Sequence, residues 1–363
     1  LLEETADRVE KHPSITIHTE TQVTGGAGSV GRFHTTLEGP DGAVETIEHG
    51  AAVIATGGGE VPGTEVGFGY GESDRVITQR ELEIGLDDGS VDPSTLETVV
   101  MIGCAGTRKE PRNYCSRVCC ATALKHAIEL KEAQPDLAVY MLYRDMMSYG
   151  FTETYFTEAR RKGIIFIAYP ADTPPGVTVD GSGVRVGARD PVLGREVEIA
   201  ADLLVLAAGV TPALPVDLAA AFGVPTDIDG FFHEADSKWR PVDALREGVF
   251  ACGLAHSPRN IPESIATAAA AAQRALRLLA RRELPAGRVV AEVRESLCAL
   301  CERCIETCPY GARSLSAEGD RVEVDPAMCQ GCGACAAICP NSASYVEGFA
   351  FDQMLEIIDA ALV

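Results

Sequence analysis

The sequence predicts an α/β protein with parallel sheets, followed by a small cysteine-rich α+β domain. Three observations lead to this fold class. Short apolar runs typical of buried strands alternate with helical patterns, several of these runs end in glycine, and Cys-x2-Cys repeats are concentrated in the last third of the chain. The chain has 363 residues, 46% of them hydrophobic and 6% aromatic, which suffices for two or three domains with a buried core.

The first part of the chain is predicted to begin with an amphipathic helix over Leu1–Val9, and we expect a fragment because the first residue is Leu inside that pattern. Alternating apolar residues predict a strand over Ser14–Val23, and Arg32–Leu37 followed by a Pro-Asp-Gly turn predicts a hairpin. Ala51–Ala55 is predicted as a fully buried strand. It leads into a glycine run over Thr56–Gly59, where the backbone can pass close to a ligand.

From residue 98 onward, apolar runs and helical patterns alternate, and this order predicts a parallel sheet. The predicted strands cover Thr98–Gly103, Ala138–Tyr143, Gly163–Ala168, Ala201–Ala208 and Gly248–Gly253. The predicted helices cover about Ser116–Glu132, a segment between the second and third strands, Glu263–Arg282 and the closing residues Phe351–Leu362. Pro285 and Gly287 mark a linker.

Charge and hydropathy exclude several classes of partner. Lys and Arg number 31 and Asp and Glu 53, so the formal net charge is -22, and nucleic acid and anionic membranes are poor partners. The apolar run Leu203–Ala221 is interrupted by Pro212, Pro215 and Asp217, and we expect a soluble protein without membrane insertion. The 13 cysteines are odd in number and lie in tight repeats, which argues against a disulfide scaffold and for a reducing, anoxic cytoplasm.

Eight cysteines form two copies of the pattern C-x2-C-x2-C-x3-C-P. This is the bacterial two-cluster ferredoxin run, in which the fourth cysteine of each copy ligates the other cluster. The predicted ligands of one 4Fe-4S cluster are therefore Cys298, Cys301, Cys304 and Cys339, and those of the other are Cys329, Cys332, Cys335 and Cys308. A pair of zinc knuckles is the alternative, but zinc leaves the third cysteine and the Cys-Pro of each copy unexplained.

A second cysteine group lies where a nucleotide-binding domain carries its phosphate-binding glycines. Cys104-Ala105-Gly106-Thr107 follows the predicted strand at Thr98, in place of a full G-x-G-x-x-G. Cys115, Cys119 and Cys120 follow shortly after. This spacing favours a metal cluster over dinucleotide binding, with buried core cysteines or a redox pair as the alternatives.

Two motifs around these cysteines carry a family resemblance. Cys104-Ala105-Gly106-Thr107-Arg108 and Tyr114-Cys115-Ser116-Arg117-Val118-Cys119-Cys120 closely resemble the A-type subunits of heterodisulfide reductases. The resemblance extends from Val23-Thr24-Gly25-Gly26 through Val76-Ile77-Thr78-Gln79 to the C-terminal cysteines. It implies a thioredoxin-reductase-like flavoprotein with two Rossmann-like dinucleotide-binding domains, in which Cys104, Cys115, Cys119 and Cys120 hold a third 4Fe-4S cluster close to an FAD.

Gly248–Ala255, followed by Pro258–Ile265, looks like the second FAD fingerprint of flavoprotein disulfide reductases, and an ordinary strand-to-helix turn is the alternative. With the resemblance, the candidate FAD-binding residues are Val23, Ala55, Thr56, Gly57, Gly58, Gly253, Leu254, Ala255, Arg259, Ile261, Pro262, Ser264 and Ile265. The first fingerprint, G-x-G-x-x-G, is missing from this sequence. Gly25–Gly31 is glycine-rich but is predicted to lie between strands without a following helix, so either the chain is a fragment or another polypeptide completes the site.

Two charged side chains are candidates for catalytic roles. The family places a lysine near the flavin at the position of Lys125, where a cation stabilises a reduced, anionic flavin, and a solvated helix lysine is the alternative. Glu81 is the second flavin-side candidate, and Cys252 is interpreted as a core residue. We expect the basic residues near the third cluster to contact partner proteins, namely Arg108, Lys109 and Arg112.

The predicted domain organisation follows from these motifs. Residues 1–97 are the first part of an FAD-binding domain, 98–211 an inserted NAD(P)-binding-like domain with the third cluster, and 212–288 the second part of the FAD-binding domain. Residues 289–347 form the two-cluster ferredoxin domain, and 348–363 a C-terminal helix.

The resemblance implies an FAD-based, electron-bifurcating electron-transfer subunit of a heterodisulfide-reductase-type complex. Expected partners are B- and C-type subunits, a hydrogenase or formate dehydrogenase module, ferredoxin and a separate FAD-domain half, with a homodimer inside the larger assembly. The alternatives are an iron-sulfur relay or scaffold without flavin and the related subunit of a quinone- or aromatic-ring-reducing complex. A pyridine-nucleotide-dependent flavin reductase is a further alternative, which Cys104 and Cys115 disfavour.

Overall fold

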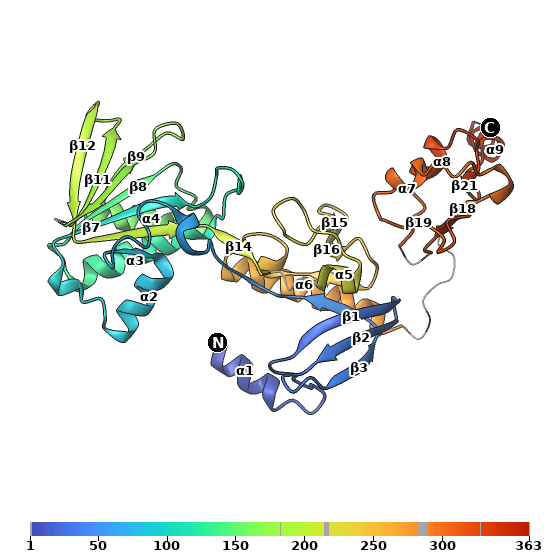
Figure 1. The fold of residues 1–363 in the computed structure, drawn as a ribbon, viewed down its shortest axis with the longest axis horizontal. Coiled ribbons are helices and arrows are strands. Elements are labelled where there is room, and N and C mark those ends of the chain that lie inside the picture. The colour runs from blue at the N-terminus through green and yellow to red at the C-terminus, as the bar shows by residue number, and fades with distance from the viewer. Residues whose placement is uncertain are drawn as a thin grey trace.

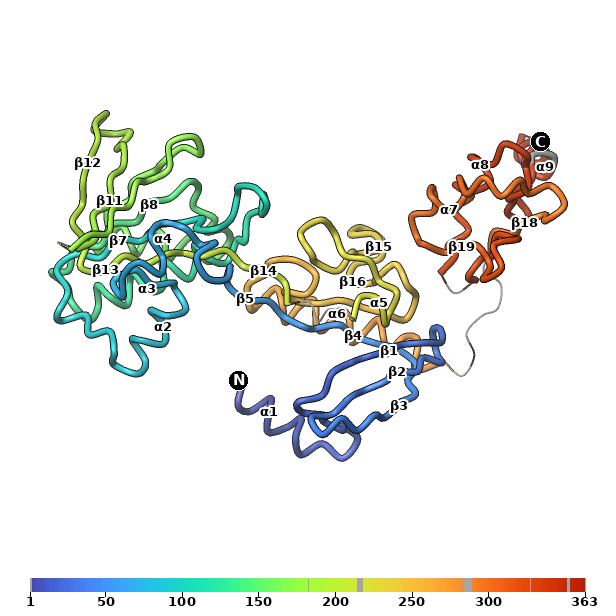
Figure 2. Tube along the Cα trace, in the orientation of Figure 1, coloured from blue at the N-terminus to red at the C-terminus, as the bar shows by residue number. Residues whose placement is uncertain are grey.

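The computed structural model describes residues 2–181, 183–213, 218–281, 283, 289–326 and 328–362. Its elements form three regions in a row: one around a parallel sheet, a central region with the long helix α6 (Ile261–Leu279), and a C-terminal cysteine-rich region (Figure 1). The chain trace passes from the central region into the parallel-sheet region and back again (Figure 2). The parallel-sheet region is therefore an insertion in the central one.

The largest sheet has five parallel strands in the order β6-β13-β7-β8-β9, which confirms the predicted α/β class. The strands are β6 (Val76–Thr78), β7 (Thr98–Ala105), β8 (Ala138–Tyr143), β9 (Ile165–Ala168) and β13 (Leu203–Ala208). Every residue of β13 is buried, because this strand has neighbours on both sides and covered faces above and below.

Helices cover one face of this sheet, and a second sheet covers the other. Val99 and Met101 of β7 pack in one core cluster with the helices α2 (Gln79–Asp88), α3 (Val118–Ala133) and α4 (Glu153–Arg161). Val100 and Ile102, which point to the opposite face, pack in a second cluster. That face is covered by the antiparallel strands β10 (Gly176–Asp180), β11 (Gly183–Asp190) and β12 (Arg195–Ala201), which are not among the predicted elements.

The central region contains a four-stranded sheet in the order β15-β16-β17-β4. Its strands are β4 (Ala52–Ile54), β15 (Glu234–Asp236), β16 (Arg240–Ala244) and β17 (Val249–Ala251). Strand β4 pairs in parallel with β17 and is the last strand on its side of the sheet. The prediction of a fully buried strand over Ala51–Ala55 is wrong in part. Ile54 is buried, whereas Val53 points to the opposite face and is 45% exposed.

A three-stranded antiparallel sheet lies beside the central region. Its strands are β1 (Gln22–Ser29), β2 (Arg32–Glu38) and β3 (Val44–His49), so the hairpin predicted after Arg32 is confirmed. The strand predicted over Ser14–Val23 is wrong. Only its last two residues belong to β1, and Ile15 and Ile17 are 44% and 50% exposed, so their alternation follows no buried face. The glycine run Gly25–Gly31, predicted between strands, lies largely within β1.

The C-terminal region combines two short antiparallel pairs with three helices. These are β18 (Ala291–Val293) with β21 (Ser344–Val346), β19 (Arg313–Leu315) with β20 (Val322–Val324), and the helices α7 (Arg303–Glu306), α8 (Ala334–Ile338) and α9 (Phe351–Ala361). The remaining described α-helices and strands are α1 (Leu2–Glu10), β5 (Gly58–Glu60) paired with β14 (Val210–Pro212), and α5 (Leu218–Phe222). Arg282, Pro285 and Gly287 lie outside the described residues.

The described residues include no helix that is both long enough and apolar enough to cross a bilayer.

The domain boundaries remain predictions. Both β6 and α2 belong to the parallel-sheet region although they precede residue 98, and β5 pairs with β14 where the chain enters and leaves that region. We propose that the inserted domain begins after β5 and ends before β14.

We expect Gly26→Ala to destabilise the protein, because this glycine serves packing in β1. A Cβ at residue 26 would lie 2.1 Å from the carbonyl oxygen of Ala221 in α5. At Gly25 the added methyl would meet Thr36 at 3.5 Å, an ordinary contact, so Gly25→Ala is the matched control. Thermal unfolding should show a loss of about 1–3 kcal/mol in unfolding free energy for Gly26→Ala alone. Equal melting temperatures of Gly26→Ala and Gly25→Ala would contradict the packing role of Gly26.

Candidate redox sites

Four cysteines surround a cavity in the C-terminal region. Cys298, Cys301, Cys304 and Cys339 line about 350 Å³ of empty space. Cys298 and Cys301 precede α7 and Cys304 lies within it, whereas Cys339 is the residue that follows α8. The structure therefore gathers the four side chains predicted for one cluster, with the fourth arriving from the other copy of the motif.

The other four cysteines line a second cavity of about 300 Å³. Cys329 and Cys332 precede α8, Cys335 lies within it, and Cys308 comes from the end of the first motif copy. Each cavity thus gathers three cysteines from one copy of the motif and the fourth from the other copy, as predicted for the two sets. Four cysteine side chains around one cavity are the donor set of a four-iron cluster.

Equivalent backbone turns shape the two cysteine loops. Glu302, with φ 59°, and Gly333, with φ 77°, each follow the second cysteine of their motif and precede the helix that carries the third. Backbone N–H groups of Ala343 and Ser344 donate to Cys339 Sγ at 3.2 and 3.5 Å. Burial raises the pKa of Cys339, but these backbone donors outweigh it and hold the pKa below its usual value. The thiolate needed for a cluster is therefore favoured at this position.

In the part of the chain that the structure describes, no three His, Cys, Asp or Glu side chains are close enough together to hold one metal ion.

The second cysteine group gathers where β7 ends and α3 begins. Cys104 lies near the end of β7 with φ 59°, Cys115 precedes α3, and Cys119 and Cys120 lie in its first turn. Burial, with Cys120 and Cys115 nearby, raises the pKa of Cys104. The hydrogen bond with Cys120 and burial likewise raise the pKa of Cys119. The hydrogen bond with Cys119 instead lowers the pKa of Cys120 to about 7, so the thiols of this group are electrostatic neighbours that shift one another in opposite directions.

Arg108 places a fixed cation beside this group. Its Nη1 lies 4.0 Å from Cys104 Sγ and 2.6 Å from Asp145 Oδ2. The Cys120 thiol donates to the main-chain oxygen of the same Asp145 at 3.6 Å. A guanidinium held in this way stabilises a thiolate and a negatively charged cluster.

The candidate flavin residues lie where two parallel strands end side by side. The turns that follow β4 and β17 meet at one sheet edge, at Gly57 and Gly253, whose φ angles of 77° and 60° favour glycine. Thr56 Oγ1 and Arg259 Nε are buried, and neither has a hydrogen-bond partner among the described residues. Unpaired polar atoms beside glycine turns at the carboxyl ends of strands fit a polar cofactor such as FAD.

The other candidate flavin residues differ in burial. Ala255 is fully buried, Leu254 lies against Gly58, and Ser264 lies next to Gly253. Val23 packs against the core cluster that contains Ala255. Three more are exposed on the outer side of the start of α6, namely Ile261, Pro262 and Ile265, and Ala55 is exposed at the end of β4. The candidate flavin residues thus include buried and exposed positions, and their role in flavin binding stays a prediction.

Arg117 links the cysteine group to the flavin segment. Its backbone N–H donates to Cys115 Sγ at 3.4 Å, and its guanidinium pairs with Glu263 in the first turn of α6. Tyr149 donates to the same Glu263 carboxylate at 2.7 Å and lies 5.3 Å from the Arg117 guanidinium, within cation-π distance. Glu263 also closes a capping box with Asn260, so this carboxylate is fixed from both sides.

The two candidate catalytic side chains have local partners. Lys125 donates to both oxygens of Glu83, at 2.6 and 2.7 Å. Glu81 accepts from the Thr78 N–H in a capping box and from the Tyr70 hydroxyl, both at 2.7 Å. Within the described residues, no recorded contact joins Lys125 or Glu81 to the flavin turns, and their flavin roles stay predictions.

Comparison with known proteins agrees with this geometry. A family model described as a 4Fe-4S dicluster domain matches residues 291–340, which include all eight C-terminal cysteines. The A-type subunit of the H(2):CoB-CoM heterodisulfide,ferredoxin reductase of Methanothermobacter marburgensis is 36% identical in an alignment of 296 residues that covers 77% of this chain and 44% of that protein. The chain is a homologue of the A-type subunits of heterodisulfide reductases. The predicted family resemblance is confirmed.

A second relative shows the same partial coverage. The A-type subunit of the ferredoxin:CoB-CoM heterodisulfide reductase of Methanosarcina acetivorans is 32% identical over 354 residues, covering 86% of this chain and 44% of that protein. The chain thus spans 44% of the length of either relative. Among solved structures, T. acidophilum thioredoxin reductase is similar with a TM-score of 0.48 and 19% identity, covering 77% of this chain and 80% of that chain.

Sequence reasoning missed the residues that connect the sites. Arg117 and Tyr149 are not predicted site residues, because their partners lie far away in the sequence and no spacing marks them. Only Asn260 and Glu263 carry a local signal, the capping-box pattern at the start of α6.

The crossed cysteine sets can be tested by pairing substitutions. We expect Cys298→Ala, Cys339→Ala and the double variant each to lose one cluster, about four irons, because both side chains line the same cavity. The matched double variant Cys298→Ala/Cys308→Ala should lose about eight irons, because it damages both sets. Anaerobic iron and sulfide assays measure this. Loss of both clusters from the Cys298/Cys339 pair would contradict the crossed assignment.

Lys125→Gln should lower stability in a pH-dependent way. The hydrogen bond from Lys125 depresses the pKa of Glu83, so the pair stabilises the fold above the unfolded-state pKa and the effect is lost as pH falls through the folded-state pKa. Because both side chains are about half exposed, the loss at neutral pH should stay below about 1 kcal/mol. Thermal unfolding at neutral and acidic pH checks it. A shifted flavin potential with unchanged stability would instead support the predicted flavin role.

Proposed function

We propose that this chain is an electron-transfer subunit of a heterodisulfide-reductase-type oxidoreductase, in which iron-sulfur clusters exchange electrons with an FAD. The observation that carries the proposal is the pair of four-cysteine cavities within one small region, which coincides with the 4Fe-4S dicluster match. Clusters of this kind carry electrons one at a time. Two of them in one small region form a relay.

We further infer a third cluster at Cys104, Cys115, Cys119 and Cys120. Its support is the electrostatic proximity of these thiols and the Arg108 cation held beside them. The Arg117–Glu263 pair joins this group to the start of α6, where Thr56 and Arg259 offer unpaired polar atoms to a flavin. FAD, when bound, supplies two-electron chemistry beside one-electron carriers.

This combination supports electron bifurcation as the finer proposal. A flavin that takes up two electrons can deliver them singly to clusters that lead in different directions. The expected partners are B- and C-type subunits, a hydrogenase or formate dehydrogenase module as donor, and ferredoxin. The name of the Methanothermobacter relative includes both H(2) and ferredoxin, which describes that protein and supports this choice.

The open side of the flavin site favours a second candidate, a relay that binds no flavin by itself. Ile261 is 74% exposed, Ile265 is 51% exposed, and β4 presents an unpaired strand edge next to them. We propose that a separate FAD-domain half from another polypeptide completes this site. Without that half, the chain would pass electrons between clusters only.

Anaerobic quantification of iron, sulfide and flavin tests the proposal. We expect about twelve irons per chain, and about eight in Cys119→Ala, because that thiol lies within the third group. The control is Cys252→Ala, a buried core cysteine outside all three groups, which should keep about twelve irons. One FAD per chain would support the flavoprotein, and flavin absent after incubation with FAD would favour the relay. About eight irons in the unmodified chain would remove the third cluster.

A further inference from the structure

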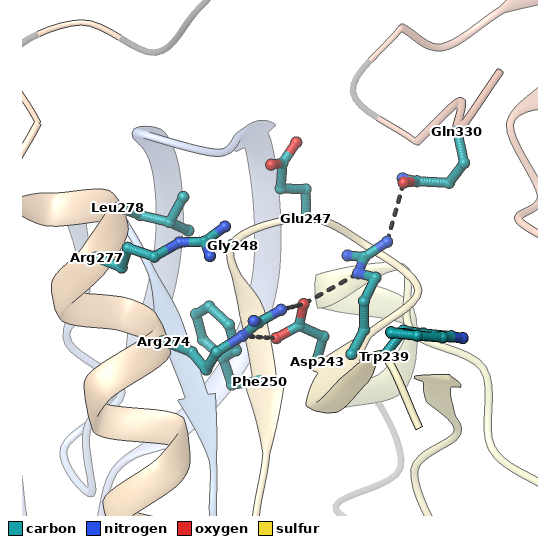
Figure 3. A pocket seen from close by; sticks show the side chains of 10 residues that line it. Trp239, Asp243, Glu247, Gly248, Phe250, Arg274, Arg277, Leu278 and Gln330 are labelled. Carbon is teal, nitrogen blue, oxygen red and sulfur yellow. Dashed lines mark hydrogen bonds and ion pairs between the residues drawn. The ribbon is translucent and has the colours of Figure 1, made fainter. Parts of the chain in front are cut away.

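A hydrogen bond joins the C-terminal region to the central region. Arg240 Nη1 donates to Gln330 Oε1 at 2.9 Å, as the dashed line in Figure 3 shows. Gln330 directly follows Cys329 and lines the cavity of the set Cys308, Cys329, Cys332 and Cys335. Arg240 belongs to β16, which pairs with β17, the strand that leads into the Gly253 turn. The contact therefore connects one cluster loop to the sheet that carries the flavin turn.

A buried carboxylate binds the Arg240 guanidinium and fixes its position. Its Nε donates to Asp243 Oδ2 at 3.0 Å, and Arg274 of α6 donates to Asp243 Oδ1 at 2.8 Å. The Asp243 side chain is 8% exposed. Figure 3 shows Arg274 pointing toward the Asp243 carboxylate, from which dashed lines mark the interactions given above. A guanidinium fixed at one end loses little further freedom when its other end binds a partner group.

Few residues of the C-terminal region take part in this junction. The cavity beside Arg240 is lined by Trp239, Arg277 and other residues of the central region, and Gln330 is the one lining residue from the described C-terminal region. Burial lowers the pKa of Arg246 in the central region, and the charge of Asp325 in the C-terminal region partly offsets this lowering. The cavity of the other cysteine set is lined by residues 298–344 of the C-terminal region alone.

We propose that Arg240 is a positioning residue that docks the cluster of Cys308, Cys329, Cys332 and Cys335 on the flavin-bearing sheet. This cluster is then the entry point between the C-terminal region and the rest of the chain, and the cluster of Cys298, Cys301, Cys304 and Cys339 is the outer one. Each electron transfer to this cluster moves one electron and no atoms. The donor, which is a reduced flavin or another reduced cluster, is oxidised by one electron, and the docked cluster is reduced by one electron. This inference rests on the proposed electron-transfer function.

The same arginine should tune the docked cluster. Reduction adds a negative charge to a four-iron cluster, and a cation near its loop favours that state and raises the reduction potential. The effect should be selective, because Arg240 contacts the loop of one cluster and no contact with the other cysteine loop is recorded among the described residues.

The test uses the full chain with its clusters loaded anaerobically. Arg240→Gln removes the cation, Gln330→Ala removes the acceptor without a charge change, and Arg277→Gln is the matched control, which removes a cation lining the same cavity. Small-angle X-ray scattering reports docking through the maximum dimension, and EPR-monitored redox titration reports each cluster separately. We expect Arg240→Gln and Gln330→Ala to broaden the distance distribution, and Arg240→Gln to lower the potential of one cluster only.

Each outcome separates the docking inference from the proposed function. One outcome is that the clusters are reducible and that Arg240→Gln and Gln330→Ala both have the scattering curves and reduction potentials of the wild type. This outcome would overturn the docking role of Arg240 and leave the proposed electron transfer intact. An equal potential shift in Arg277→Gln would show a general charge effect and would also overturn it. A wild-type chain without reducible clusters would instead refute the proposed function. Iron content equal to wild type in all variants shows that the substitutions act on docking rather than on cluster assembly.

Discussion

The structure depends on gathering thiol groups that repel one another once they are ionised. Burial raises the pKa of Cys104 and Cys335, and neighbouring thiols add to the effect at both positions. Cys304 and Cys329 are buried in the core cluster of the C-terminal region, where they pack as small apolar groups. Iron compensates the repulsion and turns the same side chains into ligands, so cluster loading and stability are coupled. The fold must consequently place each set before the metal arrives, which explains the matched turns at Glu302 and Gly333.

Three arginine side chains near the candidate redox sites each pair with a carboxylate that fixes their position. Asp145 holds Arg108 beside Cys104, Glu263 holds Arg117 between the third cysteine group and α6, and Asp243 holds Arg240 beside the ferredoxin loop. A planar guanidinium can bind a carboxylate with one edge and another group with the next, which a lysine does less well. The carboxylate thus sets the direction of the cation, and the cation joins segments that we propose to carry redox cofactors.

How much could be predicted from sequence depends on how local the signal is. The buried strands at Thr98 and Leu203 and the crossed cysteine motifs are encoded in contiguous residues, and the structure forms both. The strand predicted at Ser14 failed, because alternation alone does not show whether a buried face exists to receive Ile15 and Ile17. The β10–β12 sheet was not predicted, because polar and apolar residues are mixed along its strands. The roles of Arg117 and Arg240 were not predicted either, because their partners lie about a hundred residues away or more in the sequence.

The third cysteine group also changes the interpretation of the basic residues around it. Arg108, Lys109 and Arg112 are predicted as partner contacts in an otherwise acidic chain. In the structure, Arg108 is committed to Asp145 and Cys104, and Arg112 pairs with Glu65. Both arginine side chains are less than one quarter exposed, which suits an internal electrostatic role better than recognition of another protein. We propose that Arg108 offsets the charge of a cluster bound at this cysteine group, and partner contact by Arg108, Lys109 and Arg112 stays a prediction.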